Sequence, residues 1–266
     1  MKNILNEICN YKKNFVEERK RILPLKKLEE LCKVTNKTRG FHNAIINSSK
    51  KNKLALIAEV KKESPSAGLL FKNYEPEKIA KIYEDSGASC ISILTDEKYF
   101  KGSTNDLKEV KENTNLPCLR KDFIIDPYQV YESKALGADA ILLIMAVLED
   151  NLAIEIEKLA LKLNLDVLIE VHNRKEIERA LNLQSKLIGI NNRNLKTLKT
   201  DIENTKTLAP FIPKDYTLVS ESGLKTNKDI IKLSKYGVKG FLIGESLLNT
   251  ESIYNATKKI LNTDEY

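Results

Sequence analysis

The sequence predicts an α/β protein whose main part is a (β/α)8 TIM barrel with an N-terminal helical extension. Eight short apolar runs recur after residue 53, and amphipathic stretches of helical period separate them. This alternation predicts parallel strands joined by right-handed crossovers, and eight such units in about 210 residues fit a closed barrel. No GxGxxG follows the first apolar run, so an open doubly wound sheet that binds a dinucleotide is the weaker alternative.

The N-terminal part, residues 1–52, is predicted to be a helical extension packed on the barrel, which takes up residues 53–266 in a single overall domain. Apolar residues recur there at helical spacing: Ile4, Ile8, Tyr11 and Phe15. Pro24 interrupts this run, a second helical piece follows at 28–32, and a polar stretch at 47–52 closes the segment. We expect the extension to lie where it can cover a site on the barrel.

The strands of the barrel are predicted from runs rich in Ile, Leu and Val, at residues 54–60, 90–94, 118–121, 140–144, 167–170, 187–190, 217–219 and 240–243. Amphipathic helices are predicted between them at residues 76–86, 128–136, 152–163, 175–183 and 228–236. Gly87, Gly137 and Gly237 each follow a predicted helix, where a left-handed residue commonly ends it. These glycines are therefore assigned a structural role.

The composition is that of a globular protein, with 42% hydrophobic residues and a formal net charge of +7 in 266 residues. Lysines are spread along the chain and interleaved with Asp and Glu, which suits a phosphorylated or carboxylated small molecule at least as well as nucleic acid. No apolar stretch approaches the length of a membrane span or a signal peptide core. We therefore expect no membrane partner and a cytoplasmic location.

The four cysteines, Cys9, Cys32, Cys90 and Cys118, form neither a CxxC motif nor another short spacing typical of metal ligands. Two of them fall in apolar runs of strand character. They are predicted to be reduced thiols rather than disulfides, in keeping with a cytosolic protein. The sequence thus predicts no metal site.

The stretch with the most candidate functional residues is IAEVKKESPSAG, residues 57–68. Side chains alternate along a strand, so Glu59 and Lys61 point to the same face. A solvated charge run at 61–63 is the alternative, but Glu59 lies inside the apolar run, where an unpaired carboxylate is costly. Pro65 cannot continue a strand ladder, so the chain leaves the sheet with hydroxyls and free backbone donors, which suit an anion.

Reactive side chains also gather at the ends of later strands, the edge of a barrel where active sites lie. Lys121 shares a face with Leu119 and Phe123, so it is predicted to enter the barrel mouth beside an aromatic wall. Burial and a neighbouring cation such as Lys61 are expected to lower the pKa of Lys121 toward neutrality, as acid chemistry requires. An exposed lysine in a charged RKD sequence is the alternative.

Glu170 ends the apolar run at 167–169 and is predicted to be a buried carboxylate opposite Lys121, able to take or return a proton. The alternative is a glutamate that caps the following helix. His172 is interpreted as a loop or supporting residue.

Two loops after the last strands carry small residues and backbone donors. Ser222 and Gly223 follow the seventh strand, and residues 244–246, read as Gly-Glu-Ser, open the last helix. Many barrels bind phosphate with these two loops and the amides of a helix N-terminus. Each pattern is common alone, but the two together predict a phosphate site.

Seven segments in order resemble the indole-3-glycerol-phosphate synthase family of tryptophan biosynthesis. They are IAEVKKESPSAG (57–68), LRKDFIIDPYQVYES (119–133), GADAILLI (137–144), LIEVH (168–172), IGINNRNL (188–195), SESGL (220–224) and FLIGESL (241–247). The resemblance runs over nearly the whole chain and includes the helical extension. The chain departs from the family at Glu63 and Ala67, where a small residue and a lysine are frequent, so the charge near the phosphate differs.

The resemblance implies a decarboxylative ring closure. The substrate is 1-(2-carboxyphenylamino)-1-deoxyribulose 5-phosphate, and the products are indole-3-glycerol phosphate, carbon dioxide and water. Lys121 would protonate the ketone oxygen while the ring carbon attacks, and loss of carbon dioxide would follow. Dehydration would fall to Glu170, with Lys61 as a second acid or as electrostatic support. No metal or organic cofactor is required.

The resemblance also implies residues that bind and orient the substrate. Glu59, Asn191 and Ser222 would orient the hydroxyls and the anilino nitrogen. Phe100 and Phe123 would flank the aromatic ring. The remaining binding residues would be Arg193 and Glu221 at the polar mouth, and Ser64, Gly223, Gly244, Glu245 and Ser246 around the phosphate, largely through backbone amides. A monomer is the default expectation, with a dimer as the alternative.

Two other functions remain open at this stage. Another phosphate-binding barrel enzyme, a sugar-phosphate isomerase or an aldolase, is one; an isomerase would carry Cys or Asp where this chain has Glu59 and Lys61, and an aldolase would form an imine on Lys121. A noncatalytic barrel that binds nucleic acid is the other. It predicts a basic groove interleaved with aromatic residues, whereas this chain has no Trp and only short basic runs.

Overall fold

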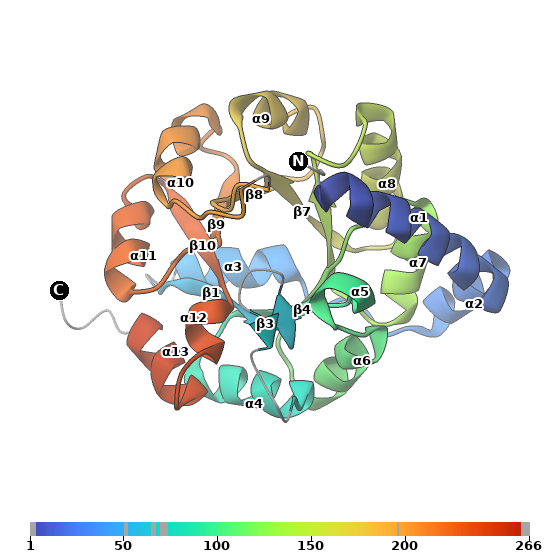
Figure 1. The fold of residues 1–266 in the computed structure, drawn as a ribbon, viewed down its shortest axis with the longest axis horizontal. Helices are drawn as coiled ribbons and strands as arrows, with labels where there is room; N and C mark the ends of the chain where they lie inside the picture. Colours follow the sequence, from blue (N-terminus) through green and yellow to red (C-terminus); the bar gives the residue numbers. More distant parts are fainter. Residues whose placement is uncertain (1–3, 51–52, 65–67, 70–73, 196, 262–266) are drawn as a thin grey trace.

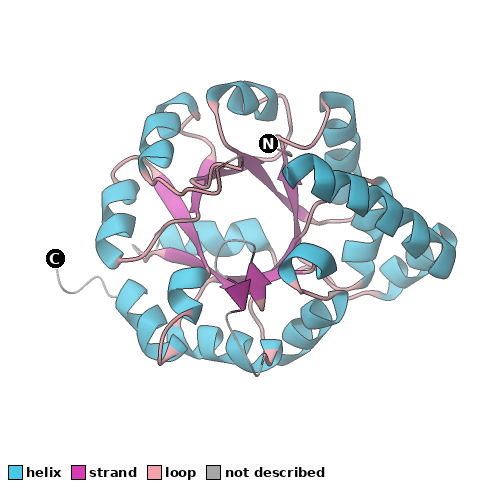
Figure 2. Cartoon of the chain, viewed as in Figure 1, coloured by secondary structure: helices cyan, strands magenta, loops and turns pink. Residues whose placement is uncertain are grey.

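A computed structural model of the chain describes residues 4–50, 53–64, 68–69, 74–195 and 197–261. Within these residues, eight parallel strands form a closed barrel in the order β1-β10-β9-β8-β7-β6-β5-β4, with helices outside it (Figures 1 and 2). The strands are β1 Ala55–Val60, β4 Cys90–Leu94, β5 Cys118–Lys121, β6 Ala140–Ile144, β7 Asp166–Val171, β8 Leu187–Asn191, β9 Thr217–Glu221 and β10 Val238–Ile243. The predicted (β/α)8 barrel is confirmed.

The helices that follow the strands form an outer ring (Figure 2). They are α4 Pro76–Ser86, α6 Thr104–Asn113, α7 Pro127–Ala135, α8 Asp150–Lys162, α9 Arg174–Ala180, α10 Glu203–Leu208, α11 Asn227–Ser234 and α13 Ile253–Leu261. Shorter pieces complete the loops: the antiparallel pair β2 Glu63–Ser64 and β3 Gly68–Leu69, the helices α5 Glu97–Phe100 and α12 Glu245–Leu248, and the 3-10 turn Ala209–Phe211. Gly87, Gly137 and Gly237 have positive φ, as predicted for residues that follow helices.

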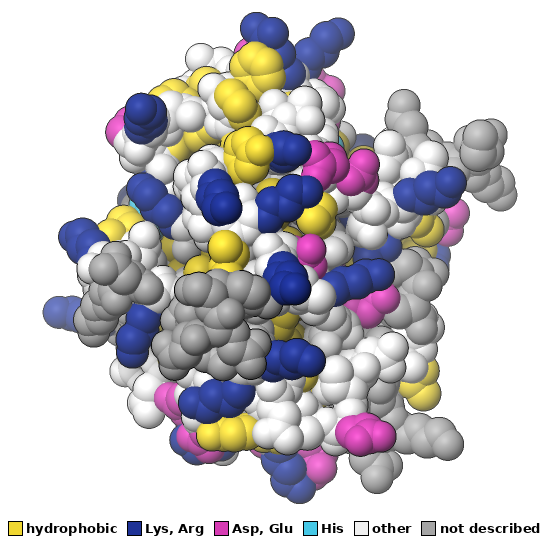
Figure 3. Space-filling model, turned by 90° about the vertical axis from the view of Figure 1, so that its left-hand side faces the viewer, with side chains coloured by type: hydrophobic (Ala, Val, Ile, Leu, Met, Phe, Trp, Pro, Cys, Tyr) yellow, Lys and Arg dark blue, Asp and Glu magenta, His cyan; other side chains and the backbone are white. Residues whose placement is uncertain are grey.

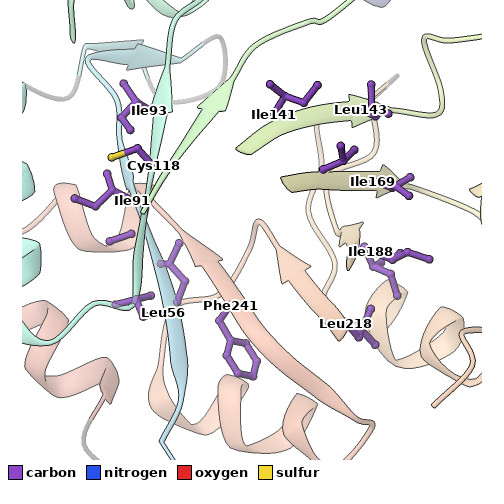
Figure 4. Packing of buried hydrophobic residues seen from close by; sticks show 14 of the residues in the cluster. Leu56, Ile91, Ile93, Cys118, Ile141, Leu143, Ile169, Ile188, Leu218 and Phe241 are labelled. Atoms are coloured by element: carbon purple, nitrogen blue, oxygen red, sulfur yellow. The ribbon is translucent and has the colours of Figure 1, made fainter. Parts of the chain in front are cut away.

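The core has two layers because successive strand residues point to opposite faces. Leu56, Ile91 and Phe241 point outward and pack between the strands and the ring of helices (Figure 4). Ile57 and Leu119, the neighbours of outward-facing residues, pack inside the barrel with inward side chains of the other strands. The two layers make the strands buried on both faces, which explains their nearly continuous apolar sequence.

Three helices precede the barrel: α1 Ile4–Ile22, α2 Leu25–Val34 and α3 Phe41–Lys50. In Figure 1, α1 runs across the rim of the barrel toward α2 and α7. α1 ends just before Pro24, as the sequence predicts. Val16 of α1 and Leu28 of α2 pack with Tyr128 of α7, and this contact fixes the path of the segment.

Helix α3 closes the end of the barrel where the strands begin. Phe41 and Ile45 are fully buried and pack with the inward side chains at that end. The backbone N–H of His42 donates to Asp166 at 2.9 Å. The sequence predicts a polar connection at 47–52, but residues 47–50 are the last turn of this helix, and residues 51–52 lie outside the described part of the chain.

The surface carries charges of both signs. On the face shown in Figure 3, Lys and Arg side chains are scattered among acidic and apolar ones and form no continuous basic groove. All four cysteine side chains are free thiols, as predicted. None of the helices in the described ranges is both long and apolar enough to cross a bilayer.

Candidate active site

Two adjoining hollows lie at the carboxyl ends of the strands. They share five lining residues, Glu59, Lys61, Lys121, Arg193 and Ser222, so together they form one elongated cavity. The first hollow has largely apolar walls that include both predicted phenylalanines, while the second is lined by the loops after β9 and β10. The structure therefore brings together the residues predicted at the strand ends.

Lys121 occupies the centre of this cavity. Its Nζ lies 3.6 Å from Oε2 of Glu170 and 3.8 Å from Oε2 of Glu221. Room for Glu221 comes from Gly189 on the neighbouring strand, because a Cβ there would lie only 2.1 Å from Oε1 of Glu221. One ammonium group thus stands beside two buried carboxyl groups.

The expectation that the pKa of Lys121 is lowered is wrong. Burial acts in that direction, but the carboxylates of Glu170, Glu221 and Glu59 outweigh it and raise the pKa of Lys121. The sequence places Lys61 near Lys121 but does not show the distances to the acids, which decide the sign. Lys121 therefore carries its proton at neutral pH.

Glu59 and Lys61 form a buried ion pair, with 2.7 Å between Nζ of Lys61 and Oε1 of Glu59. Both residues are buried, which excludes a solvated charge run here. Burial would raise the pKa of Glu59, but Lys61 and Lys121 outweigh it, so the pKa is lowered. Gly244 leaves the necessary space, because its Cβ would lie 2.5 Å from Oε1 of Glu59.

Glu170 is not a helix cap. The cap of α9 is Asn173, whose side chain accepts from the N–H of Glu176. Glu170 is buried and instead faces Lys121 on one side and His172 on the other, with 3.3 Å between its Oε1 and Nε2 of the histidine. Nδ1 of His172 lies 3.1 Å from Oε2 of Glu176, so Glu176 holds the imidazole ring in place beside Glu170.

Glu221 is almost completely removed from solvent, with 1% of its surface exposed. Neither of its carboxyl oxygens has a hydrogen-bond partner among the described residues. Burial, reinforced by the charge of Glu170, raises the pKa of Glu221 to about 8. At neutral pH this group is therefore largely the neutral acid.

The first hollow is walled by apolar side chains from distant parts of the chain. Phe100 ends α5 and Phe123 follows β5; their ring centroids are 6.5 Å apart at an interplanar angle of 37°. Leu5 and Ile8 of α1 line the same hollow. This wall suits a planar aromatic group.

The second hollow is lined by backbone turns suited to an oxyanion. Ser222 and Gly223 both have positive φ, 67° and 77°, and turn the chain directly after β9. Gly244 precedes the first turn of α12, which presents N–H groups that no helical carbonyl accepts. The hydroxyl of Ser246 donates to the carbonyl of Leu224 at 2.7 Å, so its backbone rather than its hydroxyl is available.

Polar residues of the β8 loop frame the cavity. Arg193 N–H donates to Oδ1 of Asn191 at 2.9 Å, and its guanidinium donates to the carbonyl of Leu198 and lies 3.6 Å from Oε2 of Glu245. Ser64 belongs to β2, which pairs with β3 at Gly68; the side chain of Ser64 and the whole of Ala67 lie outside the described residues.

Sequence reasoning missed several residues of the cavity: Leu5, Ile8, Leu94, Asp96, Leu142, Ile144, Leu195 and Leu198. It also missed Lys12, which is buried behind the aromatic wall. Lys12 lies on the apolar stripe of α1, four residues after Ile8 and four before Val16, and this position was a signal that it is not solvated. In the described ranges, no group of His, Cys, Asp and Glu is arranged to hold a metal ion.

Comparison with known proteins agrees with this geometry. The model of the family described as indole-3-glycerol phosphate synthase matches residues 5–260. The indole-3-glycerol phosphate synthase of Azospirillum brasilense is 46% identical over 98% of this chain and 100% of its own length. The one from Caldanaerobacter subterraneus subsp. tengcongensis is 48% identical over 93% of this chain and 94% of its own.

Among solved structures, a mutant tryptophan synthase alpha-subunit from Pyrococcus furiosus has a TM-score of 0.59 at 12% identity and covers 79% of this chain and 98% of its own. At that identity the likeness shows the barrel fold alone. The assignment of the activity rests on the sequence relatives, because their match extends over nearly the whole chain and spans every strand end that lines the cavity. The chain therefore belongs to the indole-3-glycerol phosphate synthase family, and it is a carboxy-lyase of tryptophan biosynthesis that acts on a phosphorylated small molecule.

Proposed function

We propose that Lys121 is the general acid of the ring closure and that Glu170 exchanges the proton of the dehydration step. The observation that carries this is the position of the Lys121 ammonium beside Glu170, at the point where the aromatic hollow meets the polar one. The raised pKa keeps Lys121 protonated, as a proton donor must be.

The shape of the cavity suggests how the substrate binds. Its carboxyphenyl ring would lie in the apolar hollow between Phe100 and Phe123, and its phosphate would lie against the backbone of residues 222–223 and 244–246. The ketone then falls between the two hollows, within reach of Lys121. Glu59 and Ser222 line this middle part and Asn191 lines the first hollow, and the three would orient the hydroxyls and the anilino nitrogen.

The chemistry follows in two stages. The ring carbon attacks the ketone carbon while Nζ of Lys121 donates a proton to the ketone oxygen, and loss of carbon dioxide restores the aromatic ring. Glu170 then removes a proton as the new hydroxyl leaves as water, with Lys61 as the second acid. Glu221 and Arg193 would hold polar groups at the mouth. An aldolase-type imine requires a neutral amine, which the raised pKa of Lys121 disfavours.

We further propose that the enzyme is a cytoplasmic monomer. Its four free cysteines support a reducing compartment.

The test is turnover of 1-(2-carboxyphenylamino)-1-deoxyribulose 5-phosphate, followed by indole fluorescence, for the wild type and Lys121→Ala. We expect turnover by the wild type without added metal and a fall of at least about 10²-fold in the variant, as loss of a general acid predicts. Lys108→Ala on the exposed side of α6 is the matched control and should not change turnover. A Lys121→Ala enzyme that retains wild-type turnover would show that another group is the acid.

A further inference from the structure

Lys12 of helix α1 is a buried cation outside the cavity. It is 1% exposed, and its Nζ lies 2.8 Å from Oδ2 of Asp96 and 2.8 Å from Oδ1 of Asp122. Removal of three charges from water is costly, and such a cluster is often no more stable than an apolar replacement. The question is therefore what the two carboxylates hold in place.

Asp96 fixes the segment that carries Phe100. It follows β4 and caps α5, and its Oδ1 accepts from the N–H of Tyr99 at 2.7 Å. Phe100 is the next residue and the last of this four-residue helix. The orientation of Asp96 therefore sets the direction in which α5 leaves the strand.

Asp122 fixes the segment that carries Phe123. Its Oδ1 accepts from the N–H of Phe123 at 2.8 Å, and its Oδ2 accepts from the hydroxyl of Thr95 at 2.7 Å. Burial would raise the pKa of Asp122, but Lys12 and Arg120 outweigh it and lower the pKa. Asp122 is thus an anion that faces a second anion, Asp96, across the neighbouring strand end.

Lys12 offsets part of the negative charge of this pair. Asp122 has a second ion-pair partner in Arg120, at 3.2 Å, whereas Lys12 is the one ion-pair partner of Asp96 in the part of the chain that the structure describes. Without the ammonium, the two carboxylates repel each other in a site that water does not reach. The two strand ends, and with them the two phenylalanines, would then move apart.

We propose that Lys12 is a positioning residue for the known reaction: from behind the cavity its ammonium binds the β4 and β5 loops together and sets the spacing of Phe100 and Phe123 around the substrate ring. This rests on the proposed placement of the ring between these side chains. Helix α1 then has two functions at the site, because its Leu5 and Ile8 also form part of the same wall. The aromatic ring of the substrate would contact this wall.

The experiment measures kcat and KM separately for Lys12→Met, which keeps the length of the side chain and removes its charge. The ring is bound in both the ground state and the transition state, so loosening its slot raises KM about 10-fold and leaves kcat within about 3-fold. A role confined to stability would lower the amount of folded enzyme and leave KM unchanged. Lys13→Met, on the exposed side of the same turn, is the matched control.

Asp96→Asn tests the same link between the β4 and β5 loops while Lys12 is kept. The amide keeps the oxygen that caps α5 but removes the charge, so KM rises less than in Lys12→Met, and the double variant shows less than the sum of the two effects. If Lys12→Met does not fold, the KM of Asp96→Asn alone tests the inference, and a raised KM supports it. An unchanged KM in the folded variants overturns the inference.

Phe123→Leu, measured alongside, separates this inference from the proposed function. If Phe123→Leu raises KM and Lys12→Met does not, the ring placement stands and the role of Lys12 fails. If Phe123→Leu leaves KM unchanged, the ring placement fails and the inference with it, while wild-type turnover still supports the reaction.

Discussion

The two ends of the barrel are both covered by the N-terminal helices, but with opposite chemistry. At the end where the strands begin, α3 inserts Phe41 and Ile45 among apolar side chains, and Asp166 accepts from the backbone of His42. At the mouth, α1 covers a cavity in which Oε2 of Glu170 and both carboxyl oxygens of Glu221 lack hydrogen-bond partners among the described residues.

The closed end therefore contributes mainly to the stability of the fold, and the mouth contributes mainly to its function. Buried polar groups without partners cost free energy, and a protein keeps them where a ligand completes their hydrogen bonds. The closed end shows apolar contacts and paired polar groups. The mouth instead holds carboxyl oxygens that a bound substrate would supply with hydrogen bonds. Substitutions at the two ends should therefore change different measured quantities.

The largest effect is expected at the closed end. Phe41→Ala removes a fully buried ring and should lower the free energy of unfolding by about 3–5 kcal/mol, with KM unchanged in the fraction that stays folded. Urea unfolding and steady-state kinetics measure the two quantities. Phe211→Ala, at a ring that is 42% exposed, is the control and should cost much less. A changed KM in Phe41→Ala would show that the two ends are not independent.

At the mouth the pattern should reverse. Glu170→Gln removes the proposed proton-exchanging group and should lower kcat by about 10²-fold. The free energy of unfolding should stay within about 1 kcal/mol, because without the charge of Glu170 the neighbouring Glu221 can ionise more readily and pair with Lys121. Glu178→Gln on the exposed side of α9 is the matched control for kinetics and unfolding. Strong destabilisation of Glu170→Gln would contradict the contrast between the ends.

A smaller effect should appear in the pH dependence of stability. An acid whose pKa rises on folding, here from 4.5 to about 8 in Glu221, binds more protons in the folded than in the unfolded state between these values. Its presence therefore makes stability fall as the pH rises through this window. Glu221→Gln should reduce the fall between pH 7 and pH 8 by about 1 kcal/mol, measured by urea unfolding at both values. Equal slopes for wild type and variant would show that Glu221 is ionised.

The barrel was predictable because its strands are buried on both faces and therefore read as apolar runs. All eight strands occur within a few residues of the predicted positions. Helix α3 was not predicted as a unit, because only Phe41 and Ile45 are buried and its last turn reads Asn-Ser-Ser-Lys, like a loop. Short helices such as α5 have too few residues to show a period.

The active site was predictable to the extent that strand alternation fixes the direction of a side chain. Glu59, Lys121 and Glu170 do face the same cavity. The sign of the pKa shift of Lys121 was not predictable, because it depends on distances to acids 49 and 100 residues further along the chain. Lys12 was missed for the same reason, since its partners come from two strand ends far along the sequence.

The closed end of the barrel also has a consequence for the order of folding. Strand β1 pairs with both β4 and β10, and the side chain of His42 lies 2.9 Å from the hydroxyl of Thr217, a separation of 175 residues. Contacts of such long range form late, because a long loop must close first. During synthesis, α3 leaves the ribosome before any strand of the barrel but finds its complete set of neighbours only after β10 has emerged. Helix α3, although it precedes the barrel in the chain, is therefore fixed in place only when the barrel closes.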